Sequence, residues 1–317
     1  MSTINPGDVS VIPVAGLGDG SEKAVTVRPV LSPRQRLVNV LNSSLATIIV
    51  VIIALVWSVP TLGLLISSFR PAAAIQSSGW WTGILPPWNF TLTNYQQVLS
   101  GSGQGLGQAF LNSLIISVPG TILPVLVAAF AAYAFAWMKF PGRDWIFIII
   151  VALLVVPLQM TLIPILQLLT GVGLTGSYVA IWLAHTAYGL PFSVYLLRNF
   201  FGELPSDLFE SAHIDGASHV RIFFRLVLPL AVPSLASLII FQFMWVWNDL
   251  LVALTVLGGS PDKSPLTVSI ANLVNSYGSN YEVLTAAAFI SMLLPLMIFF
   301  ALQRYFVRGI LAGSVKG

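Results

Sequence analysis

Side chains that could do covalent chemistry are few in this sequence, and they are not spaced for catalysis. The three histidines, His185, His213 and His219, fit neither an HExxH motif nor another metal-binding spacing. No Gly-Lys pair occurs, so the chain has no P-loop, and no serine lies in a GxSxG motif. The sequence therefore predicts no catalytic site, no bound cofactor and no metal site in this chain.

Charged side chains instead gather in one short stretch. Only 8% of the residues are charged, yet residues 198–225 hold seven charged side chains. They are Arg198, Glu203, Asp207, Glu210, Asp215, Arg221 and Arg225. Long apolar runs lie on both sides, so this stretch needs an explanation of its own. Residues 203–225 are called the charged segment below.

Local signals in the charged segment predict two short helices joined at a glycine. Residues 204–207 read as a helix start, with a proline followed by two N-cap candidates. Leu208 and Ala212 fall on one face at i, i+4 spacing. Gly216 favours the left-handed conformation that ends a helix, and residues 217–225 can form the second helix. Such an element could be moved as a unit by a partner, and a solvated loop fits these signals equally well.

The composition indicates a membrane protein made of helices. The chain has 317 residues, of which 56% are hydrophobic, and a mean hydropathy of +0.89, whereas soluble domains are about a quarter charged. Six apolar runs are long enough to cross a bilayer as helices. They are residues 45–66, 110–137, 145–169, 178–197, 226–257 and 284–306. We expect kinks at Pro157, Pro164 and Pro191.

Positive charge predicts the orientation of these spans. If the spans alternate, twelve of the fourteen Lys and Arg residues fall on one side and only Arg70 and Lys263 on the other. Because positive loops stay in the cytoplasm, both termini and the charged segment are expected to be cytoplasmic. Residues 1–40 lack signal-peptide features and are expected to form a flexible tail before a permease-like domain at 41–317.

The charged segment resembles the EAA loop of binding-protein-dependent ABC importer permeases. The family pattern is E-A-A, three residues, G, nine residues and then I-x-L-P. The matching residues here are Glu210, Ser211, Ala212, Gly216, Leu226, Leu228 and Pro229. Ser211 and Leu226 depart from the pattern mildly, and Asp215 with Gly216 looks like the family's frequent D-G-A.

Other stretches are similar to the carbohydrate-uptake branch of this family, and especially to the maltose-type second permease subunit and its alpha-glucoside relatives. They are Asn94-Tyr95, Asn112-Ser113, residues 241–254 and residues 305–317. The resemblance covers about residues 45–317. It implies a type I ABC importer permease fold in the bacterial inner membrane, with no ATPase site of its own.

The resemblance also implies a set of partners. These are a second, homologous permease subunit, two ATPase subunits that bind ATP and Mg²⁺, and an extracytoplasmic sugar-binding protein. The chain would form half of the translocation path for a sugar, such as an alpha-glucoside or another oligosaccharide, and would couple to the ATPase through residues 210–229. Nucleic acid is not an expected partner, because no basic run with interleaved aromatic residues occurs.

Three groups of contact residues follow from the resemblance. ATPase coupling would use Glu210, Ser211, Ala212, Asp215, Gly216, Leu228 and Pro229. The C-terminal tail, residues 307–317, would reach the ATPase through Gly313, Ser314, Val315, Lys316 and Gly317. The binding protein would contact Asn275, Ser276, Tyr277, Gly278 and Asn280, although an ordinary connecting loop also fits that stretch.

Four polar or aromatic residues of the fifth span could line the path. Gln242, Trp245, Asn248 and Asp249 have spacings of i, i+3, i+6 and i+7, which place them on one face of a helix. Aromatic rings and amide or carboxylate groups are the types that hold sugars. The same residues could instead pack the helix against its neighbours. Gln159, Gln167 and His185 could join either arrangement.

Two other kinds of protein remain as alternatives at this point. An ion-coupled secondary carrier acting alone would need ionisable groups inside the membrane, and the spans hold a single carboxylate, Asp249, and a single histidine, His185. A membrane scaffold without transport activity would need neither partners that hydrolyse ATP nor a path.

Overall fold

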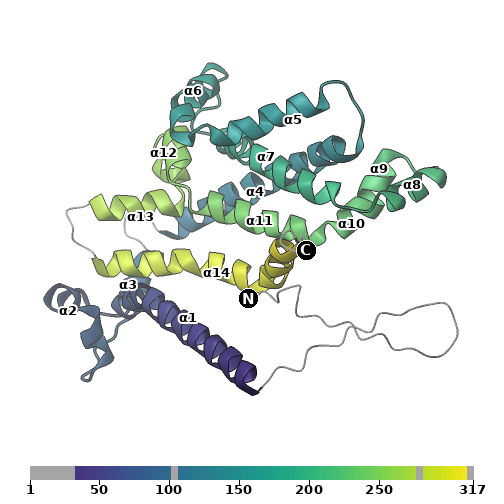
Figure 1. Cartoon of the computed structure of the whole chain (residues 1–317). Coiled ribbons are helices and arrows are strands. Elements are labelled where there is room, and N and C mark those ends of the chain that lie inside the picture. The colour runs from purple at the N-terminus through teal and green to yellow at the C-terminus, as the bar shows by residue number, and fades with distance from the viewer. Residues whose placement is uncertain (1–32, 101–105, 276–280, 313–317) are drawn as a thin grey trace. The chain divides into compact units, whose positions relative to one another are not determined.

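The structure is a computed structural model that describes residues 33–100, 106–275 and 281–312. The chain divides into two compact units, residues 1–62 and residues 63–317. All regular elements in the described ranges are helical, and no strand occurs there (Figure 1). The prediction of an all-helical protein is confirmed.

The first unit contains most of α1 (Pro33–Ser68), and the second unit holds the end of α1 and all later elements. The elements of the second unit up to residue 202 are α2 (Ala72–Ser77), η2 (Trp80–Ile84), α3 (Thr93–Ser100), α4 (Leu106–Trp137), α5 (Arg143–Ala152), η3 (Leu153–Val155), α6 (Leu158–Gly171) and α7 (Tyr178–Gly202). The remaining elements are α8 (Ser206–Ile214), α9 (His219–Ile222), the π-helical turn η4 (Phe223–Val227), α10 (Leu228–Leu230), α11 (Val232–Trp247), α12 (Leu251–Leu257), η5 (Pro261–Lys263), α13 (Leu266–Asn275) and α14 (Tyr281–Ala312).

Four helical stretches are long and apolar enough to cross a membrane unbroken. They are Ser44–Ser68, Leu106–Trp137, Tyr178–Gly202 and Tyr281–Ala301. Two of the six expected spans are bent helix pairs instead of single helices. Arg143–Val155 and Leu158–Gly171 meet at 108°, and His219–Leu230 and Val232–Trp247 meet at 76°. By length and apolar composition, the described residues thus offer four to six spans.

The sharper of these bends lies at Pro157, as the sequence predicted. Val156 adopts an extended conformation with φ −73° and ψ 117°, which the residue before a proline favours, and α5 with η3 therefore ends there. Pro164 and Pro191, by contrast, lie inside α6 and α7, which continue through them. The fifth expected span, residues 226–257, is interrupted near Ala231 and again after Trp247.

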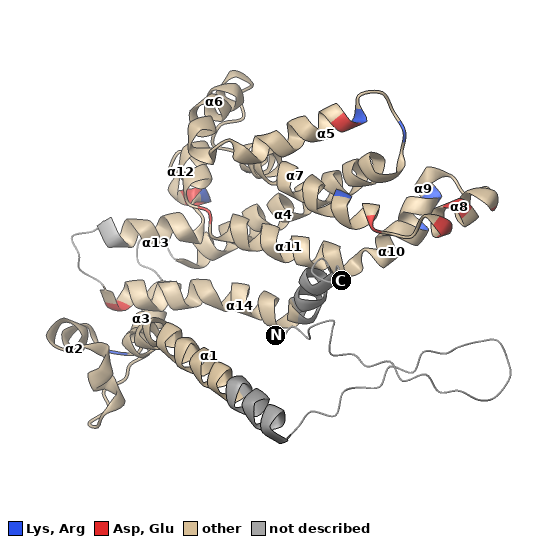
Figure 2. Ribbon diagram, in the orientation of Figure 1, with Lys and Arg blue, Asp and Glu red and all other residues tan. Residues whose placement is uncertain are grey.

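Helices α4, α7 and α11 contact one another and form the centre of the second unit (Figure 1). Two glycines allow their close approach. A Cβ atom at Gly120 of α4 would lie 3.2 Å from Val246 of α11 and 3.5 Å from His185 of α7. A Cβ atom at Gly189 of α7 would lie within about 3 Å of the Gln242 side-chain amide of α11. No charged residue occurs within α4 or α11, and Figure 2 shows the charges of this unit near helix ends, in connections and on the short helices α8 and α9.

The connection between α12 and α13 is fastened to the start of α4 by one amide. The Asn112 Nδ2 group donates to the carbonyl oxygens of Asp262, at 2.9 Å, and Ser264, at 3.1 Å. Its Oδ1 atom accepts from Gln108 Nε2, at 3.0 Å, and from the Tyr178 hydroxyl, at 2.8 Å. Asn112 is fully buried, and these four bonds match what a side-chain amide can make.

Two cations, Arg70 and Lys263, were expected on the opposite side of the membrane from the other twelve. Both donate hydrogen bonds to backbone carbonyl groups. Arg70 is 4% exposed, and its guanidinium donates to the carbonyl oxygens of Ala74, Ser78 and Gly79 and to the hydroxyl of Thr82. The ammonium group of Lys263 donates to the Gly176 carbonyl oxygen at 2.6 Å. These cations therefore hold loops together at the ends of helices.

The crossing of α7 and α11 gives a stability test. Gly189→Ala would place a methyl group against the buried Gln242 amide, and overpacking of this kind costs about 1–3 kcal/mol. We expect a lower unfolding temperature for the purified variant, measured by intrinsic tryptophan fluorescence.

The same helix offers a matched control, because a Cβ atom at Gly202 would meet nothing within 4 Å. Gly202→Ala should leave the unfolding temperature unchanged, and Gln242→Ala should relieve the effect of Gly189→Ala. Equal unfolding temperatures for Gly189→Ala and Gly202→Ala would contradict the proposed close contact.

Candidate functional site

The charged segment folds into α8, a glycine turn and α9, much as its sequence suggests. Helix α8 begins at Ser206 with Pro205 at the cap position, and no side chain caps it. The expectation that Ser206 or Asp207 acts as the N-cap is therefore wrong, because Pro205 precedes the first turn and places both residues inside it. Asp207 still lies in the first turn, where its negative charge favours the helix dipole.

The turn between the two helices depends on Gly216. Its φ angle is +72°, in the left-handed region that glycine adopts without strain. The Ala217 amide donates to the Ala212 carbonyl at 2.9 Å, and the Gly216 amide donates to the His213 carbonyl at 3.0 Å. This pair of bonds is a Schellman motif, so the helix end predicted at Gly216 is confirmed.

One side of α8 is buried and the other is exposed. Phe209 is 3% exposed and packs with the partly buried Ala212 into a cluster of residues from α4, α7 and α11. Glu210, Ser211, Asp215 and Gly216 are exposed, and Ile214 is 86% exposed. Leu208, which was predicted to share a helix face with Ala212, is 39% exposed, and the residue that α8 buries is its neighbour Phe209.

The second half of the charged segment runs directly into the helix that follows. Helix α9 begins at His219, two residues later than expected, after Ser218 accepts a long hydrogen bond from the Arg221 amide at 3.4 Å. The chain then passes through the π-helical turn and α10 before it bends into α11. Leu228 of the EAA-like pattern is half-buried in α10, and Pro229 is exposed.

Gln242 and Trp245 lie at a cavity of about 460 Å³ between the α5–α6 bend, α7 and α11. Most of its lining is apolar, and its polar groups come from few residues. Gln242 is 4% exposed and donates to the Gly120 carbonyl at 3.3 Å. The Tyr188 and Thr161 hydroxyls share a hydrogen bond of 2.9 Å, and the rings of Tyr188 and Trp245 meet edge to face at 6.5 Å.

Asn248 and Asp249 are not on the same helix face as Gln242 and Trp245, contrary to expectation, because α11 ends at Trp247. Asn248 is exposed and donates to the Met244 carbonyl at 2.7 Å. The Asp249 carboxylate accepts from the amides of Val252, at 3.2 Å, and Ala253, at 2.9 Å, and so caps the start of α12. Gln242 and Trp245 therefore lie at the cavity, whereas Asn248 and Asp249 lie where α11 gives way to α12 and are called the junction pair below.

His185 lies beside the junction pair. It is fully buried, with Nε2 at 3.8 Å from an Asp249 oxygen and its ring edge to face with Trp245 at 5.2 Å. Gln159 and Gln167, the other polar residues considered for this region, are exposed on α6 and do not line the cavity.

The sequence did not single out Tyr188 or Thr161. The available signal was their polarity within apolar runs, together with the position of Tyr188 three residues after His185.

Within the described ranges, no three His, Asp or Glu side chains come close enough to hold a metal ion. Most of the predicted contacts with the binding protein and all of the predicted tail contacts lie outside the described residues. They are Ser276, Tyr277, Gly278, Asn280 and residues 313–317. Asn275 is the last residue of α13.

Comparison with known proteins identifies relatives over most of the chain. The osmoprotective compounds uptake permease protein GgtD of Synechocystis sp. is 58% identical over 272 residues, which is 85% of this chain and 91% of the relative. The alpha-glucoside transport system permease protein AglG of Rhizobium meliloti is 57% identical over 241 residues, which is 74% of this chain and 63% of the relative.

A solved structure shares the fold. A chain of a bacterial ABC transporter involved in the import of the acidic polysaccharide alginate superposes with a TM-score of 0.71. The match covers 88% of this chain and 100% of that chain, at 22% sequence identity.

The pattern of one protein family, the binding-protein-dependent transport system inner membrane component, matches residues 124–312. That range holds more than half of the chain and includes the charged segment, the cavity and the α11–α12 junction. The chain therefore belongs to the family of binding-protein-dependent transport system inner membrane components.

Proposed function

We propose that this chain is a permease subunit of an ATP-driven importer for sugars, and that a separate ATPase drives it through the charged segment. The observation that carries the proposal is the form of this segment. A Schellman turn at Gly216 holds α8 so that Phe209 is anchored in the helix bundle, while Glu210 and Ile214 face outward. An exposed acidic and apolar face on an anchored helix suits binding by another protein.

The proposed transporter contains further subunits. A second, homologous permease would complete the path, two ATPase subunits would bind ATP and Mg²⁺, and an extracytoplasmic sugar-binding protein would deliver the substrate. The name of one relative, an alpha-glucoside transport system permease protein, supports a sugar as the substrate. An alpha-glucoside or another oligosaccharide is the proposed cargo.

In this proposal the chain spans the bacterial inner membrane six times, with each bent helix pair counted as one span, and both termini lie in the cytoplasm. The hydrogen bonds of Arg70 and Lys263 to carbonyl groups are compatible with this orientation. Both residues have structural partners, so their place on the outer side does not conflict with the tendency of positive loops to remain inside.

The proposed translocation path passes the cavity at Gln242 and Trp245. Two partly exposed aromatic rings beside an amide and two hydroxyl groups suit a sugar ring, which offers both an apolar face and hydroxyl groups. Asn248 and Asp249 would act at the mouth of this path, where α11 gives way to α12. Residues 275–280 remain the proposed contact with the binding protein, and residues 313–317 the proposed tail contact with the ATPase.

An ion-coupled carrier acting alone is less well supported. Such a carrier needs carboxylates that can bind and release an ion, and both oxygens of Asp249 accept helix-capping hydrogen bonds. The remaining acidic residues of the described second unit lie in the charged segment, at helix ends or in connections (Figure 2).

Two substitutions in the charged segment test the coupling role. Glu210→Lys reverses the charge of an exposed side chain, and Gly216→Pro removes both the left-handed turn and one amide donor of the Schellman motif. We expect each to abolish uptake of radiolabelled maltose, sucrose or trehalose by cells, while the amount of protein in the membrane fraction stays normal.

Gly216→Asn is the matched control, because asparagine tolerates the left-handed conformation better than other non-glycine residues. It should retain most of the uptake. If Glu210→Lys and Gly216→Pro both transport the sugar at the normal rate, the charged segment does not couple the permease to an ATPase.

The path can be tested separately at Trp245. Trp245→Ala removes the indole from the cavity, and loss of aromatic stacking worth about 1 kcal/mol predicts a KM for uptake raised roughly five-fold. The control is Trp145→Ala on α5, whose side chain is largely exposed and does not line the cavity. An unchanged KM in Trp245→Ala would remove this residue from the path.

A further inference from the structure

The last turns of α4 hold the first half of the charged segment through an aromatic stack. The rings of Trp137, the final residue of α4, and Phe209 of α8 are 3.5 Å apart between centroids and are inclined by only 15°. The indole Nε1 of Trp137 also donates to the Phe201 carbonyl near the end of α7, at 2.8 Å. One side chain thus joins α4, α7 and α8.

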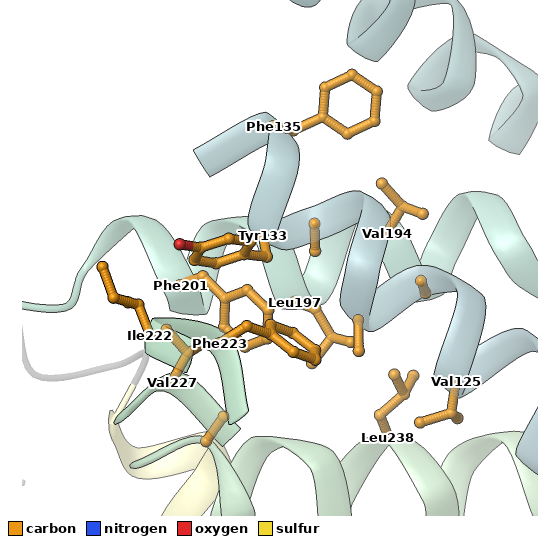
Figure 3. Close-up of a cluster of buried hydrophobic side chains, with 14 of the residues drawn as sticks. Val125, Tyr133, Phe135, Val194, Leu197, Phe201, Ile222, Phe223, Val227 and Leu238 are labelled. Carbon is orange, nitrogen blue, oxygen red and sulfur yellow. The ribbon is translucent and has the colours of Figure 1, made fainter. Parts of the chain in front are cut away.

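One helical turn earlier, α4 holds the second half of the same segment. The Tyr133 hydroxyl lies 3.1 Å from His219 Nδ1 at the start of α9. The Tyr133 ring is 5% exposed and packs against Phe223 with centroids 5.4 Å apart. Figure 3 shows Tyr133 and Phe223 close together within the buried cluster that also contains Phe201.

These contacts give the charged segment two attachments to α4, on either side of the turn at Gly216. Attachment at a single point would allow the segment to rotate about it, whereas two points separated by a helical turn fix its direction. The covalent route from the segment to α11 is different, because it passes through a π-helical turn and a 76° bend. Interruptions of this kind are places where a helix can flex.

We propose that Trp137 and Tyr133 are positioning residues that clamp the charged segment to α4, so that a displacement of the segment moves α4 and α7 with it. This inference rests on the proposed function, in which an ATPase moves the segment. Neither residue lines the cavity at Gln242 and Trp245. Their role is to transmit a displacement that would otherwise be absorbed at the π-helical turn and the bend before α11.

The exposed face of α8 supports this division of roles. Glu210 and Ile214, which would meet the partner, lie on α8 away from Phe209, which is held by Trp137. A push on the exposed face is therefore opposed directly by the aromatic stack. Loosening the stack should leave partner binding intact and should weaken only the transmission of movement.

The experiment uses the complete transporter, purified through a tag on this chain and placed in proteoliposomes with its binding protein and maltose, sucrose or trehalose. The measured quantity is the number of ATP molecules hydrolysed for each sugar imported. Tyr133→Phe removes one hydroxyl, and Trp137→Ala removes the stack and the indole donor. Since the loss of a hydrogen bond changes an equilibrium by about five-fold, we expect this ratio to rise by about that factor in Tyr133→Phe. The rise should be larger in Trp137→Ala.

Trp137→Phe keeps an aromatic ring against Phe209 and should restore much of the coupling that Trp137→Ala loses. Trp182→Phe is the matched control. Trp182 of α7 donates from Nε1 to the Ile115 carbonyl of α4 at 2.9 Å, so this variant deletes a similar bond between the same two helices away from the charged segment. Its ratio of ATP to sugar should equal that of the unaltered protein.

A double variant separates a specific clamp from general loosening of the fold. If the hydroxyl of Tyr133 acts through His219, adding His219→Gln to Tyr133→Phe should raise the ratio no further than either change alone. Additive effects, or normal ratios in Tyr133→Phe and Trp137→Ala, would overturn the clamp. If the unaltered complex shows no ATP hydrolysis stimulated by the sugar-loaded binding protein, the proposed function itself fails, and that result is distinct from failure of the clamp.

Discussion

The close crossing of α4, α7 and α11 is the constraint on which the rest of the second unit depends. Gly120 and Gly189 remove side chains where these helices meet, and the Gln242 amide occupies the space between them. In lipid, where apolar surface gives helices little reason to associate, small residues and interhelical hydrogen bonds of this kind determine which helices pack together. The cavity opens beside this crossing, and the charged segment is anchored at one end of the same three helices.

The features that depend on local sequence could be predicted, and those that depend on tertiary contacts could not. Long apolar runs predicted helices because an unpaired backbone is too costly in lipid. Gly216 and Pro157 also behaved as expected, since each restricts its own backbone conformation or that of its neighbour. The end of α11 at Trp247 was missed because the run from 226 to 257 is strongly apolar on both sides of Asn248 and Asp249, and mean hydropathy carries no information about a break in direction.

The site residues also divide into those that local sequence predicts and those that depend on tertiary contacts. The exposed positions of the charged segment could be chosen from spacing, because Glu210 and Gly216 belong to a local pattern. Asp249 was expected on a helix face, but its carboxylate caps α12, which depends on where α11 ends. Tyr133 and Trp137 carried no distinctive signal, as their partners, His219 and Phe209, lie more than seventy residues away along the chain.

The hydrogen bonds that hold Arg70 and Lys263 to backbone carbonyl groups fix where these two cations lie relative to the nearby carboxylates. Arg70 is buried and Lys263 is partly covered, whereas Asp262 and Tyr281 are exposed and Glu282 is half-buried. Although formal charges there nearly cancel, a molecule approaching in solution meets the carboxylates before the cations. Because these charges balance, attraction of a basic surface to the carboxylates acts only at short range, and it should weaken as ionic strength rises.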